Sequence, residues 1–242
     1  PSRFRDDSQP RAQSNRSGWY NVPLRTFPLI VHPAFISFVE HERRLDHGLY
    51  QAPAVEVPTH RPELRKITDI ADYVQITHLI IRGIMRRTWR HYRTFYFNKS
   101  DGSKRRIDSP RTFLKVIQWW ILDTILYNAE VHECAHGFVP YKSFLTNARE
   151  HVGARHVLNV DIEDFFPSIT TRHVAAVFQQ LGYIDSVAED LARLTTYNNC
   201  LPQGAPTSPM IANLLLRQFD EATYLRCAEN EMRYTRYADD IT

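Results

Sequence analysis

The sequence predicts an α+β fold, and three observations support this prediction. Apolar residues recur at helical spacing in several separate segments. Alternating aromatic residues precede an Asp101-Gly102 turn signal, which is typical of a β-hairpin. Two further apolar segments end in clusters of carboxylates and read as strands. With 242 residues, of which 43% are hydrophobic and 12% aromatic, the chain is long and apolar enough to bury a core.

Residues 1–60 are predicted to form an irregular N-terminal extension, because they contain seven prolines and few periodic stretches. The folded part is expected over 61–242. It begins near Pro62, which suits the first turn of a helix. The apolar residues that follow at helical spacing are Leu64, Ile67, Ala71 and Val74.

Four further elements are predicted along the middle of the chain. The segment "HYRTFYFNKSDGSKRRIDSP" is expected to form the β-hairpin. The helix after it has an inward stripe of Phe113, Ile117, Trp120, Ile121 and Thr124. The apolar run of "HVLNVDIEDF" is typical of a buried strand. The helix in "TRHVAAVFQQLG" has an inward stripe of Val174, Val177, Phe178 and Leu181, with Gly182 as its C-cap.

The last predicted helix follows the loop "NNCLPQGAPTSP". Ser208 can cap this helix, and Pro209 lies in its first turn. Its buried stripe is expected to consist of Ile211, Leu214, Leu215, Phe219, Ala222 and Leu225. The final segment, "MRYTRYADDIT", reads as a strand that enters a turn.

Basic residues are concentrated in one segment. Between Arg82 and Lys115 the chain carries eleven Lys and Arg against two Asp, although its formal net charge is only +3. This concentration indicates a polyanionic partner, and the alternative is a solvated charged face. The three cysteines form no CxxC pair, which favours a reducing cytoplasm over a disulfide framework. No apolar stretch approaches the roughly 20 residues of a membrane span, so no membrane partner is expected.

Carboxylates directly follow two of the predicted strands. Asp161 ends the run "VLNVD", with Glu163 and Asp164 just beyond it, and "RYADD" ends in Asp239 and Asp240. If these strands are neighbours in one sheet, Asp161 and Asp239 converge at one edge. Carboxylates held that close repel one another unless divalent cations lie between them. Two oxygen-liganded Mg²⁺ ions are the standard arrangement for in-line displacement at phosphorus.

The adjacency of Asp239 and Asp240 restricts their geometry. Neighbouring side chains on a regular strand point to opposite faces, so both can approach one metal pair only at the tight turn of a hairpin. We therefore expect Asp239 to be the direct bridging ligand, with Asp240 as a second ligand. For "YADD" alone, a polar turn without chemistry is an equal alternative, and the strand that ends at Asp161 favours the metal site.

Three motifs, "HVLNVDIEDFFPSI", "LPQGAPTSPMIANL" and "YTRYADD", resemble in this order the palm motifs of reverse transcriptases. The segment "FNKSDGSKRRIDSP…LKVIQ" is similar to the fingers segment of bacterial members. "AHGFVPYKSFLTNA" and the signature "NAREH" resemble retron reverse transcriptases, and group II intron enzymes share part of the former. The resemblance covers roughly residues 60 to 242.

This resemblance implies the fingers and palm subdomains of a right-hand polymerase over 61–242, with an incomplete palm over about 152–242. The chain begins at Pro1 and stops two residues after Asp240. We therefore expect a fragment of a longer product, with the thumb absent from this chain.

The resemblance also assigns roles to individual residues. It implies that two Mg²⁺ ions are held by Asp161, Asp239, Asp240 and the carbonyl of Ile162. Nucleotide binding is implied for Lys99, Arg105, Phe166, Gln203 and Gly204. Among these, Phe166 falls at the steric gate that excludes a ribose 2′-OH, and Phe165 beside it reads as a core residue. RNA binding is expected for Arg86, Arg87, Arg90, Arg93, Lys104, Arg106, Asn147 and His151, the last with a structural role as its alternative.

By resemblance, the protein is an RNA-directed DNA polymerase that extends a 2′-OH of a structured non-coding RNA with dNTPs. Its product would be a branched RNA–DNA, and its further partner an effector protein in antiphage defence. The first alternative is a group II intron-like or other defence-associated reverse transcriptase with another priming mode. The second is a non-catalytic RNA-binding scaffold with the same fold.

Overall fold

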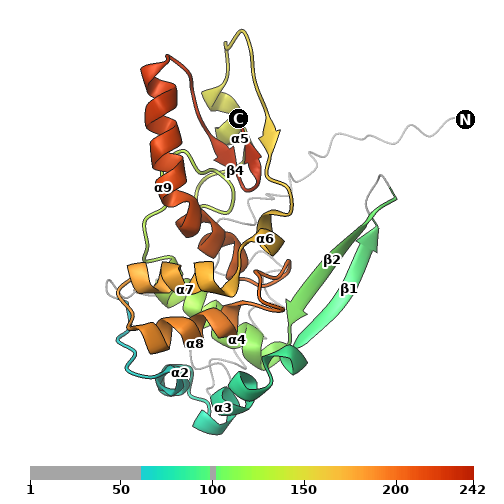
Figure 1. The fold of residues 1–242 in the computed structure, drawn as a ribbon, viewed down its shortest axis with the longest axis vertical. Coiled ribbons are helices and arrows are strands. Elements are labelled where there is room, and N and C mark those ends of the chain that lie inside the picture. The colour runs from blue at the N-terminus through green and yellow to red at the C-terminus, as the bar shows by residue number, and fades with distance from the viewer. Residues whose placement is uncertain (1–60, 99–101) are drawn as a thin grey trace, which may run out of the picture.

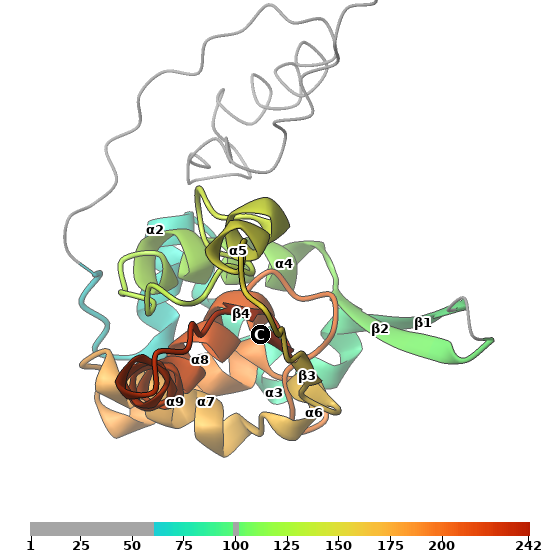
Figure 2. The same ribbon diagram turned by 90° about the horizontal axis from the view of Figure 1, so that it is seen from above.

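A computed structural model describes residues 61–98 and 102–242 of the chain (Figures 1 and 2). The predicted extension over 1–60, the nucleotide-binding candidate Lys99 and the turn residue Asp101 lie outside the described residues. Within them, helices are mixed with small antiparallel sheets, which confirms the predicted α+β class.

Short helices open the described part of the chain. They are η1 (Ile67–Asp69), α2 (Ile70–Val74), α3 (His78–Arg86) and η2 (Thr88–His91). The predicted apolar residues from Leu64 to Val74 are buried, as expected. The helix predicted from Pro62 does not begin there, because helical structure starts only at Ile67. It ends after Val74, because Gln75 adopts a left-handed conformation with φ of 50°.

The predicted hairpin consists of β1 (Tyr92–Asn98) and β2 (Lys104–Pro110), paired in register from Tyr92 opposite Pro110 to Asn98 opposite Lys104. It projects away from the helical body (Figures 1 and 2). Its base is anchored by the buried Tyr92, whose ring stacks on Tyr197 at 4.5 Å between centroids. The hairpin is therefore fixed at its base while its outer residues are exposed.

The hydrophobic core lies among the helices. Its central elements are α4 (Thr112–Ile121), the π-helical turn η3 (Leu122–Leu126), α7 (Thr171–Gln180) and α8 (Asp185–Thr195). The predicted inward residues of α4 are buried except Thr124, which is half-buried in η3, and Phe113, which is 43% exposed. In the first turn it is Leu114, 0% exposed, that faces the core. The C-cap residue of α7 is Leu181, so the predicted C-cap Gly182 lies one residue further along, where its φ of 95° gives the left-handed conformation that commonly follows a helix.

The long helix α9 (Ser208–Glu229) departs from its prediction in two ways. Thr207 is the N-cap residue, and Ser208 is the first helical residue, whose hydroxyl donates to the carbonyl of Pro202. Of the predicted stripe, only the N-terminal part is buried, since Phe219 and Leu225 are 47% and 53% exposed. The core covers only the first turns of this helix, whereas its far end leaves the helical body (Figure 1).

A small sheet has the order β3-β5-β4, with antiparallel neighbours. Its strands are β3 (Val160–Asp161), β4 (Arg236–Tyr237) and β5 (Asp240–Ile241). The prediction of a buried strand in "HVLNVDIEDF" was wrong, because Val157, Leu158 and Val160 are 54%, 76% and 48% exposed. Among the described residues only β5 pairs with β3, so β3 is an edge strand.

Two short helices flank this sheet. They are α5 (Phe144–Glu150), which lies beside β4 (Figure 2), and α6 (Phe165–Ser168), which follows β3. The hydroxyl of Ser143 caps α5 by accepting from the amide of Thr146. In the described ranges, every helix is too short or too polar to cross a membrane.

Candidate active site

The carboxylate clusters of the two predicted strands lie side by side. In the β3–β5 ladder Asp161 is the direct partner of Asp240, and the amide of Ile162 donates to the carbonyl of Asp239 at 3.1 Å. The expectation that these strands are neighbours in one sheet is therefore confirmed. The residue opposite Asp161 is Asp240, however, and Asp239 lies one residue away, in the turn.

That turn contains only Ala238 and Asp239, because Tyr237 and Asp240 pair across it. Ala238 has φ of 61°, a conformation that two-residue hairpin turns require and that side chains with a Cβ rarely adopt. The tight hairpin expected from the Asp-Asp sequence is thus present. It releases Asp239 from strand alternation, so that this side chain need not point away from the face used by Asp161.

The three acids interact electrostatically. Burial raises the pKa of Asp240 first, and the negative charges of Asp239 and Asp161 raise it further. Asp161 and Asp240 are exposed, and Asp239 is half-buried. Across 61–98 and 102–242, no three His, Cys, Asp or Glu side chains already converge as a metal-binding group. The donor set itself, three hard carboxylate oxygens on paired strands, suits Mg²⁺ in its chemistry.

A buried ion pair behind the turn was not predicted from the sequence. Arg236 on β4 and Asp220 on α9 are both 0% exposed and lie 2.6 Å apart. The available signal was the spacing of Asn213 and Asp220, two polar residues seven apart on the inward face of a helix. Such residues require buried polar partners, but the sequence does not say which.

The two neighbouring phenylalanines after β3 differ in burial. Asp164 adopts φ of 49° and turns the chain from the strand into α6. Phe165 is 6% exposed and belongs to the core, as predicted. Phe166 is half-buried, with its ring centroid 5.2 Å from that of Phe165. The second ring packs against the core but is partly exposed, on the short helix that directly follows β3.

The Gln203-Gly204 loop packs against the base of the hairpin. The amide of Asp108 on β2 donates to the carbonyl of Gln203 at 2.7 Å. Gly204 has φ of 118°, and a Cβ there would lie 2.8 Å from Cγ2 of Ile107. The close approach expected of this glycine is therefore made to β2 within the protein.

The basic residues gather along α3, η2 and the hairpin. Those exposed are Arg82, Arg86, Arg87, Arg90, Arg93, Lys104, Arg105 and Arg106. Arg106 is engaged by Asp108 at 2.9 Å, so it is a weaker candidate for a phosphate contact than its neighbours.

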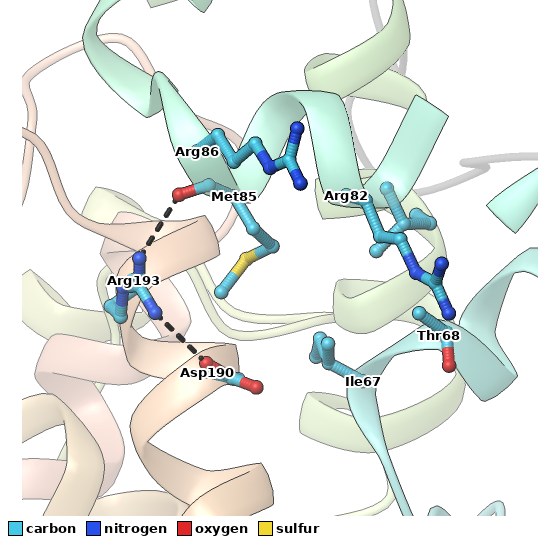
Figure 3. A pocket seen from close by; sticks show the side chains of 8 residues that line it. Ile67, Thr68, Arg82, Met85, Arg86, Asp190 and Arg193 are labelled. Atoms are coloured by element: carbon cyan, nitrogen blue, oxygen red, sulfur yellow. Dashed lines mark hydrogen bonds and ion pairs between the residues drawn. The ribbon is translucent and has the colours of Figure 1, made fainter. Parts of the chain in front are cut away.

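Arg86 and Arg82 also line a hollow of about 460 Å³ between α3 and α8 (Figure 3). A third cation there, Arg193, is held by Asp190 and by the carbonyl of Met85. The other two guanidinium groups extend over the rim of the hollow (Figure 3).

The "NAREH" signature, residues 147–151, contacts the segment that leads into the β4–β5 hairpin. His151 and the hydroxyl of Thr235 share a hydrogen bond of 2.7 Å, directly before β4. Burial and the nearby charge of Arg233 lower the pKa of His151. Oδ1 of Asn147 is buried, without a hydrogen-bond partner in the part of the chain that the structure describes. The hydrogen bond to Thr235 therefore supports a structural role for His151, the alternative to RNA binding.

Comparison with known proteins identifies the family. Residues 97–242 match the family model for reverse transcriptase (RNA-dependent DNA polymerase). The chain is 36% identical over 183 residues to the Retron Ec86 reverse transcriptase of Escherichia coli, covering 75% of this chain and 57% of that protein. It is 39% identical over 173 residues to the Retron Mx162 reverse transcriptase of Myxococcus xanthus, covering 64% of this chain and 36% of that protein. The chain therefore spans roughly a third to just over half of the length of these relatives.

Proposed function

The chain belongs to the reverse transcriptase family, and on this premise we propose that it carries the fingers and palm of an RNA-directed DNA polymerase with its catalytic centre at the β3–β5 edge. The observation that carries this proposal is the pairing of Asp161 with Asp240, next to a turn that holds Asp239. Two negative charges directly opposite each other in a ladder repel and are unfavourable. A bound cation would offset this repulsion and explain why both positions carry aspartate.

Members of this family use divalent metal ions. Two Mg²⁺ ions would be held by the three carboxylates, with the carbonyl of Ile162 as a further oxygen donor. When bound, they supply Lewis-acid stabilisation of the charge that develops on the attacking and leaving oxygens. The primer hydroxyl would lose its proton to water, its oxygen would form a bond to the α-phosphorus of the dNTP, and the bond from that phosphorus to the leaving pyrophosphate would break.

The other residues of the site bind and select the nucleotide. Phe166 would exclude a ribose 2′-OH by steric contact. Arg105, with Lys99, would bind the triphosphate, because guanidinium and ammonium groups donate to phosphate oxygens. Gln203 and Gly204 would lie against the incoming nucleotide from the base of the hairpin.

The partner RNA is proposed from the similarity to retron reverse transcriptases. We expect a structured non-coding RNA that serves as template and supplies a 2′-OH as primer, which gives a branched RNA–DNA. The exposed arginines of α3, η2 and β1 would contact its phosphates without regard to sequence. An effector protein and a role in antiphage defence belong to the same proposal.

The full-length protein with its RNA tests this proposal. It should make cDNA that stays covalently attached to RNA, and Asp239→Ala should abolish synthesis. The matched control is Asp72→Ala, because the Asp72 side chain is 74% exposed on α2, away from β3 and β5. Product that persists in Asp239→Ala would exclude the assigned catalytic centre.

The 5′ end of the DNA separates the alternatives. A branch to RNA indicates the retron mode, whereas a link to protein or an ordinary 3′-OH primer indicates another class of reverse transcriptase. A non-catalytic scaffold would make no DNA and would bind no Mn²⁺ near Asp161 and Asp239, even with a nucleotide present.

A further inference from the structure

The ion pair behind the acidic turn is fully buried and hydrogen-bonded on both sides. Nε and Nη2 of Arg236 donate to the two carboxylate oxygens of Asp220, at 2.9 and 2.6 Å. The hydroxyl of Tyr234 donates to the same carboxylate at 2.9 Å. Well-packed apolar residues often stabilise a protein as much as a buried ion pair does, so stability alone is a weak reason for this one.

The remaining donors of the guanidinium point to the turn. Nη1 of Arg236 donates to the carbonyl of Ala238 at 2.9 Å and to Oδ1 of Asn213 at 3.0 Å. Ala238 is the residue with φ of 61°, and it directly precedes Asp239. The guanidinium thus holds the carbonyl of a residue whose backbone conformation is intrinsically unfavourable.

The opposite side of the turn is also packed. A Cβ on Gly137 would lie 2.4 Å from the amide nitrogen of Ala238, so only a glycine leaves room for the turn in this position. The carbonyl of Gly137 accepts from Nδ2 of Asn213 at 2.9 Å. The same Asn213 therefore contacts both Arg236 and the segment that covers Ala238.

We propose that Arg236 is a positioning residue for the catalytic carboxylates, which it serves through the carbonyl of Ala238. Asp220 and Asn213 orient the guanidinium, the guanidinium fixes the turn, and the turn presents Asp239 and Asp240 to Asp161. This inference rests on the proposed polymerase function. It assigns Arg236 no contact with the substrate, because the side chain is 0% exposed.

The double variant Asp220→Leu/Arg236→Met in the full-length protein separates positioning from stability. Apolar side chains of similar volume replace the ion pair, which by itself costs little stability. The hydroxyl of Tyr234 and Oδ1 of Asn213 lose their buried partners, so the melting temperature should fall, but no further than in the core variant Leu191→Ala. The turn loses its hydrogen bond, so kcat should fall about a hundredfold, as expected for a misplacement of about 1 Å. The Mn²⁺ dissociation constant, measured without substrate, should rise about tenfold.

Two further variants support this test. Arg236→Lys keeps the charge but lacks the planar fork, so it should also lower kcat and Mn²⁺ affinity, and it replaces the double variant if that protein does not fold. Leu191→Ala, in the core on α8, should lower the melting temperature and leave kcat unchanged below that temperature.

The outcomes are distinguishable. A wild-type protein that makes no cDNA with its RNA would contradict the proposed function itself. An active wild type, together with a folded double variant or Arg236→Lys that keeps wild-type kcat and Mn²⁺ affinity, would overturn the positioning role alone.

Discussion

Asp161 and Asp240 face each other across one rung of the antiparallel β3–β5 ladder. Their Cα atoms belong to a directly opposed pair, in which side chains on the same face lie within about 5.5 Å at Cβ. A third carboxylate, that of Asp239, is adjacent in the turn. The sheet is thereby built around a concentration of negative charge, which a purely structural hairpin would avoid.

The repulsion at this rung predicts a pH-dependent effect of Asp240→Asn. Because the pKa of Asp240 is raised in the folded protein, folded protein binds the proton more tightly than unfolded protein, and stability falls as pH rises from about the ordinary value of 3.8 through the raised pKa. Without divalent metal, Asp240→Asn should therefore raise the melting temperature at pH 7.5, and the gain should disappear near pH 3.5.

Thermal unfolding in a chelating buffer, over a series of pH values, measures this effect. Glu63→Gln is the control, because Glu63 is exposed and distant from the sheet. A lower melting temperature for Asp240→Asn at pH 7.5 would show that the carboxylate stabilises the hairpin instead.

Gly137→Ala should damage the site through the backbone. The added Cβ would lie 2.4 Å from the amide nitrogen of Ala238, so the turn that holds Asp239 must move. We expect a loss of about 1–3 kcal/mol in unfolding free energy, typical of overpacking, together with loss of cDNA synthesis.

Gly83→Ala is the matched control for this variant. Gly83 lies within α3, where an added methyl group would have no atom within 4 Å, and alanine favours helix by about 0.5–1 kcal/mol over glycine. This variant should be stabilised and active. Equal behaviour of the two variants in unfolding and synthesis assays would contradict the close approach at Gly137.

Gly204→Ala should raise the KM for dNTPs. Its Cβ would lie 2.8 Å from Cγ2 of Ile107 and 3.2 Å from the carbonyl oxygen of Asp108, which would push the loop away from β2. Gly153→Ala has a similarly positive φ, 84° against 118°, but open space around the added methyl. Steady-state kinetics should show a larger KM only for the first variant, and an unchanged KM there would remove the loop from the nucleotide site.

Arg86→Ala/Arg90→Ala should weaken RNA binding, because the change removes two exposed cations that are proposed to contact phosphates. The slope of log K against log salt concentration should decrease by about 0.7 for each phosphate that is no longer neutralised on single-stranded RNA. Arg172→Ala, an exposed residue at the start of α7, should leave the slope unchanged. Filter binding at several salt concentrations measures the slope for both variants. An unaltered slope for Arg86→Ala/Arg90→Ala would show that these two arginines do not contact RNA phosphates.

Local signals predicted the acidic turn better than they predicted burial. The tight turn at Asp239 follows from two adjacent aspartates and strand alternation, which are local properties. The pairing of this hairpin with the strand of Asp161 is a long-range contact, which the sequence could offer only as a condition. The exposure of Leu158 and of Phe219 was not predictable, since burial depends on what another part of the chain covers. The pairing of Asp220 with Arg236 is likewise a tertiary contact between a helix and a strand, and no spacing rule specifies it.

The hydrogen bond from the amide of Asp108 to the carbonyl of Gln203 links the projecting hairpin to a loop of the proposed nucleotide site. It joins the base of a long two-stranded arm to the loop that contains Gly204, which is already in tight contact with Ile107. A rotation of β1 and β2 toward a bound nucleic-acid strand must either move this loop as well or break the hydrogen bond between Asp108 and Gln203. A displacement of β1 and β2 would therefore also change the shape of the proposed nucleotide pocket.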